Sequence, residues 1–387
     1  MTSLKQQLQE QLAQKKTAGL YRQRKTSTGP QQAEIIIDGK KVINFCSNNY
    51  LGLANHPEIN AAFKKGIDLY GSGSGSAHLI NGHSAAHHAL EEELAEFTGY
   101  PRCLLFSTGY MANLGVVQAL VSRGDVVLED RLNHASLLDA GLLSGARFSR
   151  YRHADSNAAE KSLKKYPQQK KLLLTDGVFS MDGDIAPLPE LAKICQQQNS
   201  WLMVDDAHGF GVLGEKGRGC IEHFDLKMDE VPVLMGTLGK AFGTSGAFVV
   251  GDEDLVEYLI QSARSYIYTT ATPPALAEAT RASLRLVQTE SWRREKLRDN
   301  INYFRQSMTD LGVELMASDT AIQPIVMGDS HKATQISRQL FDRGLHVSAI
   351  RPPTVPEGTA RLRITLTAEH NQHHLQRLID ALSEVIL

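Results

Sequence analysis

The sequence predicts an α/β protein whose large domain is built on a mostly parallel, doubly wound sheet, with a smaller α+β domain at its C-terminal end. Two observations support this prediction. Short apolar runs alternate with amphipathic stretches between about residues 46 and 290, which is typical of βαβ units. After Pro273-Pro274 the pattern changes to a long helical region with short strands. We therefore expect an N-terminal arm (1–45), a large domain (46–290) and a C-terminal domain (291–387).

The arm is expected to contain a helix and a short hairpin. Leu4, Leu8 and Leu12 lie four residues apart, a spacing that predicts an amphipathic surface helix. Asp38-Gly39 lies between two β-branched runs and predicts a hairpin over residues 34–44.

The elements of the two domains follow from the same patterns. Apolar runs predict buried strands at 103–106, 125–128, 171–175, 201–204, 231–235 and 247–250, and helices are expected at 89–97 and 112–121. Beyond them we expect a helical region over about 275–312, strands near 322–326 and 361–365, and a final helix over about 369–386.

Composition excludes several classes of function. The chain of 387 residues has 42% hydrophobic and 22% charged residues and a formal net charge of −2, which favours neither nucleic acid nor an anionic membrane as partner. No apolar run approaches the roughly 20 residues of a membrane span, and the N-terminus is too polar for a secretory signal. Four scattered cysteines without a C-x-x-C pair indicate free thiols in a cytoplasmic enzyme. No metal site is predicted.

Two residues carry the strongest chemical signal. Lys240 lies on a glycine-flanked loop after the apolar run 231–235, and a lysine there can form a Schiff base with an aldehyde. Asp205 ends the apolar run 201–204, and a carboxylate at a strand end can hold a protonated pyridine nitrogen. These are the two protein groups that pyridoxal 5'-phosphate (PLP) needs most, so the pair points to amino-acid carbanion chemistry.

Other polar groups also follow predicted strand ends, where the ligands of such sheets collect. His208 is expected to reach the phenolic oxygen of the ring, and His134 to stack on its open face. Gly109 and Tyr110 open a helix after a strand, so their N–H groups form an anion site for the phosphate. Hydroxyl donors are expected from Ser180 and Thr237, and more weakly from Thr269 and Thr270; helix capping or turn formation remains the alternative for each hydroxyl.

Competing motifs are weaker. Gly209–Gly214 satisfies G-x-G-x-x-G after a strand, but a loop follows it where the dinucleotide site needs a helix, so an NAD-dependent oxidoreductase is a distant alternative. The chain has neither a G-x-S-x-G nucleophile elbow nor a P-loop. Asp205 and Asp206 are adjacent on a strand and point to opposite faces, which argues against a shared metal ion.

The order of several motifs along the chain resembles the α-oxoamine synthases, PLP enzymes of the aspartate aminotransferase-like fold (fold type I). The motifs are Asn48-Asn49-Tyr50-Leu51-Gly52-Leu53, Gly109-Tyr110-Met111-Ala112-Asn113, Asn133-His134-Ala135-Ser136, Asp182-Gly183-Asp184, Asp205-Asp206-Ala207-His208-Gly209 and Thr237-Leu238-Gly239-Lys240. One departure is Leu238, where some relatives have an aromatic residue.

Within this family, residues 349–356 and 358–363 look most like the member of biotin synthesis that condenses L-alanine with a pimeloyl thioester. Members that use glycine, such as 2-amino-3-ketobutyrate CoA ligase, are the nearer alternative. The resemblance implies a homodimer with composite active sites. It implies that Lys240, Asp205, His134 and His208 are catalytic, with His134 also contacting substrate.

The resemblance also implies the substrate-binding residues. Arg363 matches the arginine that binds the amino-acid carboxylate, with Asn48 as its partner, and Arg22 and Thr354 match positions near the acyl substrate. Arg361 and Arg363 are two residues apart and share one face of a predicted strand, and a strand with one exposed charge is the alternative interpretation.

Overall fold

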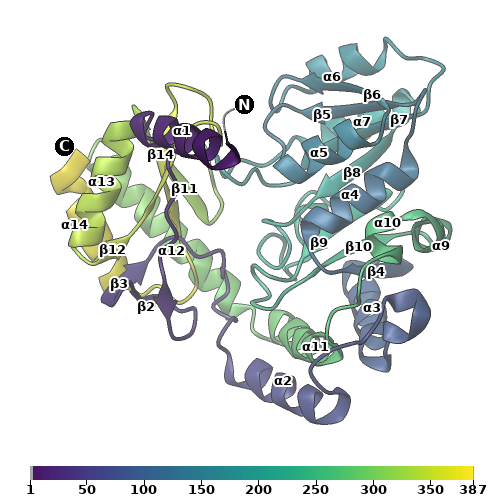
Figure 1. Cartoon of the computed structure of the whole chain (residues 1–387), viewed down its shortest axis with the longest axis horizontal. Coiled ribbons are helices and arrows are strands. Elements are labelled where there is room, and N and C mark those ends of the chain that lie inside the picture. Colours follow the sequence, from purple (N-terminus) through teal and green to yellow (C-terminus); the bar gives the residue numbers. More distant parts are fainter. Residues whose placement is uncertain (1–2, 387) are drawn as a thin grey trace. The chain divides into compact units, whose positions relative to one another are not determined.

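The computed structural model describes residues 3–386, which form two compact units (Figure 1). The larger unit comprises residues 49–180 and 184–295. The smaller unit is built from both ends of the chain, within residues 1–48 and 296–387, together with residues 181–183.

The larger unit contains a seven-stranded sheet in the order β4-β10-β9-β8-β7-β5-β6. Neighbouring strands from β9 to β6 run parallel, whereas β10 is antiparallel to both β9 and β4. The bounds are β4 (Arg102–Phe106), β5 (Val126–Asp130), β6 (Arg147–Tyr151), β7 (Lys171–Asp176), β8 (Trp201–Asp205), β9 (Val233–Thr237) and β10 (Ala247–Gly251).

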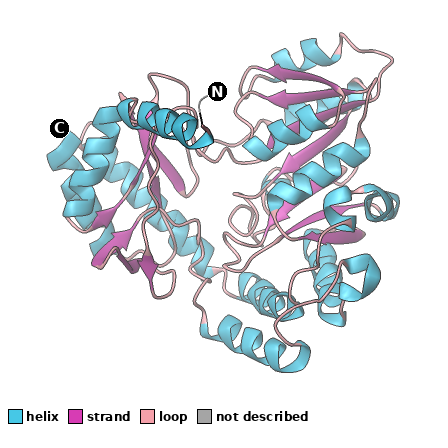
Figure 2. Ribbon diagram, viewed as in Figure 1, coloured by secondary structure: helices cyan, strands magenta, loops and turns pink. Residues whose placement is uncertain are grey.

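Helices flank these strands (Figure 2). Every residue of β5, β7 and β10 is buried, so both faces of the central sheet are covered, as in a doubly wound fold. The helices of this unit are α2 (Pro57–Tyr70), α3 (Ala85–Thr98), α4 (Gly109–Leu120), α5 (Ala135–Leu143), α6 (Ser156–Leu163), α7 (Leu188–Gln197), α8 (Cys220–His223), α9 (Glu253–Ser262), α10 (Arg264–Ile267) and α11 (Pro274–Thr289), with a π-helical turn, η1, at His78–Gly82.

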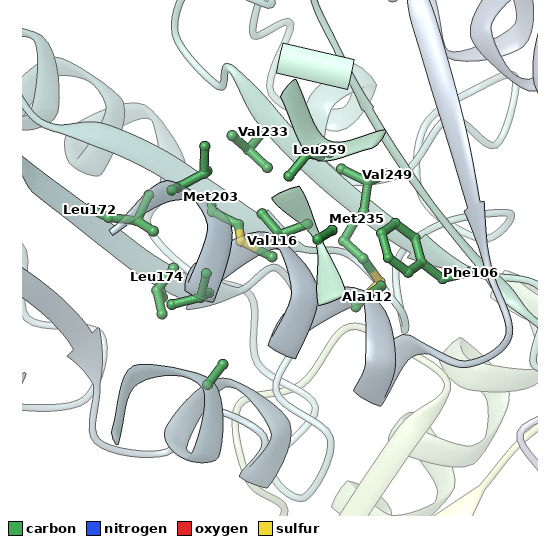
Figure 3. Packing of buried hydrophobic residues seen from close by; sticks show 14 of the residues in the cluster. Phe106, Ala112, Val116, Leu172, Leu174, Met203, Val233, Met235, Val249 and Leu259 are labelled. Atoms are coloured by element: carbon green, nitrogen blue, oxygen red, sulfur yellow. The ribbon is translucent and has the colours of Figure 1, made fainter. Parts of the chain in front are cut away.

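One hydrophobic cluster of the larger unit lies between α4 and one face of the sheet (Figure 3). Leu172 and Leu174 are alternate residues of β7, and Val233 and Met235 are alternate residues of β9, so each pair points to the same face. These side chains pack in one cluster with Val116 of α4. The helix is thereby held with its N-terminus at the edge of the sheet where the parallel strands end.

The predicted fold class is confirmed, with small shifts in element boundaries. The strand expected at 231–235 begins at Val233, because Pro232 has no N–H to donate and the N–H of Val231 bonds instead to the carbonyl of Lys227 in a turn. The helix expected at 89–97 begins at Ala85, since Ser84 caps it. The helical region expected over 275–312 is divided at residues 290–291 into α11 and α12 (Trp292–Asp310).

The smaller unit contains two short sheets. The first has the order β1-β2-β3-β12 and the second β11-β14-β13, and only the β3–β12 pair is parallel. Its elements are α1 (Leu4–Thr17), β1 (Ser27–Thr28), β2 (Glu34–Ile37), β3 (Lys40–Asn44), most of α12, β11 (Ile322–Gly328), α13 (Ser330–Asp342), β12 (Leu345–His346), β13 (Ser348–Ile350), β14 (Ala360–Thr365) and α14 (Gln372–Ile386).

The predicted hairpin and N-terminal helix are both present in this unit. Asp38 and Gly39 have φ values of 50° and 79°, the positive values that a two-residue hairpin turn of this kind requires. Helix α1 buries none of its residues. Among residues 3–386, no helix is both long enough and apolar enough to cross a membrane.

Candidate active site

A cavity of about 200 Å³ opens at the carboxyl ends of the parallel strands of the larger unit. It brings together eight residues singled out in the sequence, which follow β5, β7, β8 and β9 or open α4. They are Gly109, Tyr110, His134, Ser180, Asp205, His208, Thr237 and Lys240. Polar ends of successive parallel strands meet at one edge of a sheet, and this topology explains why residues up to 131 positions apart line one cavity.

Asp205, the last residue of β8, presents a buried and firmly oriented carboxylate to this cavity. Its Oδ2 accepts a hydrogen bond from Asn113 Nδ2 at 2.7 Å, and its Oδ1 accepts one from the N–H of Ala207 at 3.0 Å. Asn113 also donates to Ser136 Oγ at 2.8 Å, which ties α4 to the start of α5. The carboxylate of Asp205 is therefore held in a fixed orientation before any ligand binds.

Asp206, by contrast, does not line the cavity. Its Oδ2 accepts a hydrogen bond from the N–H of Cys220 at 2.7 Å, and the side chain is fully buried. A Cβ built on Gly209 or Gly219 would lie within about 2.2 Å of its carboxylate oxygens. The side chains of Asp205 and Asp206 therefore lie in different environments, as expected for adjacent residues at a strand end.

His134 is positioned through both its backbone and its ring. Its N–H donates to Asp176 Oδ2 at 3.0 Å, and its Nδ1 lies 2.8 Å from Ser136 Oγ. Desolvation by the surrounding protein lowers the pKa of His134, although the nearby charge of Asp205 acts in the opposite direction. The lowered pKa favours the neutral imidazole, and a neutral ring is suited to stack on an aromatic ligand.

His208 contacts the side chain of Tyr50. Its Nδ1 lies 2.6 Å from the Tyr50 hydroxyl, and the two ring centroids are 6.1 Å apart. This contact joins residues 158 positions apart in sequence and fixes the orientation of the imidazole that lines the cavity.

The N-terminus of α4 forms the anion-binding end of the cavity. Thr108 caps this helix through Met111, so the N–H groups of the first turn point outward from its positive end. A Cβ on Gly109 would lie 2.9 Å from the Thr237 methyl group, closer than packing permits. Glycine at 109 therefore lets the helix end approach the hydroxyl-bearing residue that follows β9. Thr269 and Thr270, the weaker candidates, do not line this cavity.

The loop after His208 has the form expected from the sequence. Residues 209–219 contain turns without a helix, and the next helix, α8, has only four residues. The G-x-G-x-x-G match therefore lacks the helix N-terminus that would bind a pyrophosphate.

Three residues around the site were assigned no role from the sequence, although two of them, Tyr50 and Asn113, lie within the motifs that carry the family resemblance. Asp176 lines the cavity and is buried, and its Oδ1 has no hydrogen-bond partner within the described chain. Burial raises the pKa of Asp176 well above its usual value, and the neighbouring Asp205 adds to this effect. The sequence did contain a signal for Asp176, because this residue directly follows the apolar run 171–175. The roles of Asn113 and Tyr50 had no such signal, because each depends on a contact distant in sequence.

The donor set fits PLP. An amine at Lys240, a buried carboxylate at Asp205 and a helix N-terminus next to hydroxyls match the aldehyde, the pyridine nitrogen and the phosphate of that cofactor. The unpartnered Asp176 Oδ1 and the close approach made possible by Gly109 are the features of a cavity shaped for a polar ligand.

The remaining predicted site residues belong to the smaller unit. Arg363 donates from Nη1 and Nη2 to Asn48 Oδ1 at 3.3 and 3.2 Å, and from Nη1 to Thr365 Oγ1 at 2.8 Å. Arg361 forms an ion pair with Asp182. Both arginines are buried, so the alternative of one exposed charge on this strand is wrong.

Arg22 and Thr354 are also brought together in this unit, but at its surface. Arg22 Nη2 lies 3.5 Å from Thr354 Oγ1, and both residues are exposed.

Comparisons with known proteins agree with this geometry. The aminotransferase class I and II family matches residues 40–382. A relative from Methylococcus capsulatus named 8-amino-7-oxononanoate synthase is 61% identical, and the match covers 97% of each chain. The structure of an 8-amino-7-oxononanoate synthase from Francisella tularensis has a TM-score of 0.78 and 34% identity, covering 89% of this chain and 97% of that one.

A serine palmitoyltransferase from S. paucimobilis with bound PLP and myriocin has a TM-score of 0.93 at 30% identity, covering 98% of this chain and 96% of that one. The motifs, the cavity and these matches agree on one assignment: the chain belongs to the aminotransferase class I and II family, as a PLP-dependent enzyme of the α-oxoamine synthase group.

Proposed function

We propose that this enzyme condenses L-alanine with a pimeloyl thioester, releasing carbon dioxide and the free thiol carrier and giving 8-amino-7-oxononanoate, a step of biotin biosynthesis. The observation that carries the proposal is the 61% identity to a relative of that name over nearly the whole of both chains. The geometry of the cavity supports a PLP-dependent reaction of this kind.

PLP, when bound, supplies an electron-withdrawing ring that stabilises negative charge on the α-carbon of the amino acid. In the proposed reaction Lys240 holds the cofactor through its Nζ and then moves the proton at the α-carbon of alanine. Asp205 accepts a hydrogen bond from the pyridine nitrogen and keeps it protonated. The two oxygens of this carboxylate already accept hydrogen bonds from Asn113 and Ala207, so its orientation is set in advance.

The other residues bind and orient. We assign the phosphate to the N–H groups of Gly109 and Tyr110, with Ser180 and Thr237 as hydroxyl donors. His134 stacks on the ring and contacts the substrate, and His208 binds the phenolic oxygen.

Arg363 binds the carboxylate of alanine, with Asn48 holding the guanidinium in place. Arg22 and Thr354 contact the acyl chain or its carrier.

A product assay with purified, PLP-loaded enzyme tests this function. L-alanine and glycine are each combined with acyl thioesters of several lengths, carried on coenzyme A or on acyl carrier protein. We expect the highest kcat/KM for L-alanine with a pimeloyl thioester. A higher kcat/KM for glycine with acetyl-CoA would instead support the 2-amino-3-ketobutyrate CoA ligase-like alternative.

We further propose a cytoplasmic homodimer. All four cysteines are free thiols, which supports a reducing compartment. Large apolar side chains are exposed at Ile80 and Tyr268, and the Ala77–Thr270 bridge joins the two segments that carry them. Closed two-fold dimers are the commonest oligomers, and such a surface suits one. A monomer with full activity in sedimentation experiments would contradict the dimer.

A further inference from the structure

A second cavity of the larger unit, about 710 Å³ in volume, has histidines and glutamates on its wall. It is lined by residues of η1, of the following turn and of α3, among them His78, His83, His88, Glu91 and Glu92, and on its other sides by Arg102 and Cys103 of β4, Ile260 of α9 and Tyr266 of α10. It shares none of its lining residues with the cavity that contains Lys240. The proposed reaction therefore gives this group of side chains no role.

Three of these residues have the spacing of a metal site. His83, His88 and Glu91 each offer one ligand atom, and the three atoms lie within 4.8 Å of one another. His88 and Glu91 are three residues apart on α3 and so share one face of the helix, while His83 lies directly before the capping residue. His83 Nε2 and Glu91 Oε2 are 3.9 Å apart. Ligands around a tetrahedral zinc ion lie about 3.3 Å apart, so small side-chain rotations are enough to close the site.

Neighbouring groups already orient two of the three ligands. His78 Nδ1 lies 3.0 Å from His83 Nδ1, and when the latter carries the proton, Nε2 of His83 has the lone pair that faces Glu91. Glu91 Oε1 accepts the N–H of Leu105 at 2.9 Å, which leaves Oε2 to face His83. Hydrogen bonds of this kind orient the ligands in known metal sites.

A second group, His78, His83 and His87, is equally compact but is less suitable. His87 Nδ1 accepts the N–H of Ser84 at 3.1 Å as part of the cap of α3, and its Nε2 lies 2.8 Å from the carbonyl oxygen of Thr272. Both ring nitrogens are therefore engaged in holding the fold. Ligation by His87 would break one of these bonds, whereas ligation by His88 costs only an exposed contact with Glu92.

We propose that His83, His88 and Glu91 bind one divalent transition-metal ion of the zinc class, with a fourth position left for water. Two imidazoles and one carboxylate are a donor set that Zn²⁺ accepts readily.

The binding of Zn²⁺ alone to the PLP-loaded full chain tests the proposal, measured by competition with a chromogenic chelator. We expect one equivalent per chain at this site. His88→Asn and Glu91→Gln should each weaken its binding by at least about tenfold, which corresponds to about 1.4 kcal/mol. Zn²⁺ should also raise the melting temperature of the wild type more than that of either variant.

His373→Asn is the matched control, because His373 is exposed and also lies beside another histidine on a helix. It should leave zinc binding unchanged. His88 is itself two-thirds exposed, so His88→Asn keeps the proposal testable even if Glu91→Gln fails to fold. Wild-type binding no tighter than that of His88→Asn, or a loss of binding in His373→Asn equal to that in His88→Asn, would overturn the proposal.

Discussion

The buried carboxylate of Asp205 gives a prediction in which stability and activity can be separated. In Asp205→Asn, one carboxylate oxygen becomes an NH₂ group. If the new NH₂ group replaces Oδ2, it faces the NH₂ donor of Asn113. If it replaces Oδ1, it faces the N–H donor of Ala207. Either orientation loses one hydrogen bond and leaves a buried donor without an acceptor. A buried unsatisfied group costs about 1–3 kcal/mol, so the cofactor-free variant should unfold more easily by that amount.

The internal control is the double variant Asp205→Asn with Asn113→Asp, which exchanges the two side chains. The amide at position 205 can then donate to the carboxylate at position 113. We expect the double variant to recover most of the lost stability but none of the activity, because the negative charge has moved away from its position at the end of β8. Activity should fall about 10²–10³-fold in both variants, the usual cost of removing one preorganised electrostatic group.

Urea titration followed by the fluorescence of Trp201 measures the stability, since Trp201 begins β8, the strand that ends at Asp205. All variants are made in the Trp292→Phe protein, because the chain has two tryptophans and this change leaves Trp201 as the source of the signal. A swap as unstable as the single variant, or a single variant as stable as the wild type, would refute the hydrogen-bond reasoning. A swap with restored turnover would refute the assigned role of the charge.

Three further predictions follow from other residues. Borohydride reduction followed by peptide mapping should place the cofactor on Lys240, and Lys240→Ala should still bind PLP but lose turnover; a label on another lysine would contradict this. Arg363→Ala should raise the KM for alanine roughly 10–100-fold and change the KM for the thioester less, because a charge-assisted hydrogen bond contributes about 1.5–3 kcal/mol; an unchanged KM for alanine would rule out the assigned role. Desolvation opposes protonation of His153, but hydrogen bonds to two carboxylates raise its pKa to about 10. His153→Gln should therefore lower the free energy of unfolding by on the order of a few kcal/mol below pH 6.5, and by progressively less towards pH 10. A difference in urea titrations that does not change with pH would disprove this prediction.

The sequence was most informative where chemistry follows a strand end. Lys240, Asp205 and His134 could be grouped before their distances were known, because parallel strands bring their carboxyl ends to one edge of a sheet. Contacts between distant segments had no such pattern. The pairing of Tyr50 with His208, and of Asn113 with Asp205, depends on how whole elements pack.

Strand direction and the burial of charge were equally hidden. The apolar run that forms β10 looks like any other buried strand, although it runs antiparallel to both of its neighbours. Arg361 and Arg363 alternate with apolar residues in a pattern typical of a half-exposed strand. Their burial depends on Asp182 and Asn48, polar partners from distant parts of the chain that satisfy the guanidinium groups.

The pairing of β3 with β12 determines the order in which the chain can fold during its synthesis. Leu345 pairs with Ile43 across about 300 residues, so the smaller unit lacks a strand until the ribosome has made almost the entire chain. The larger unit is nearly continuous in sequence and is synthesised well before that point. Until then the free edge of β3 in the β2–β3 hairpin has no partner strand. Such an edge is a template for association with other chains. Slow translation or truncation before residue 345 should thus favour aggregation through this hairpin, whereas the larger unit has its strands complete by residue 251.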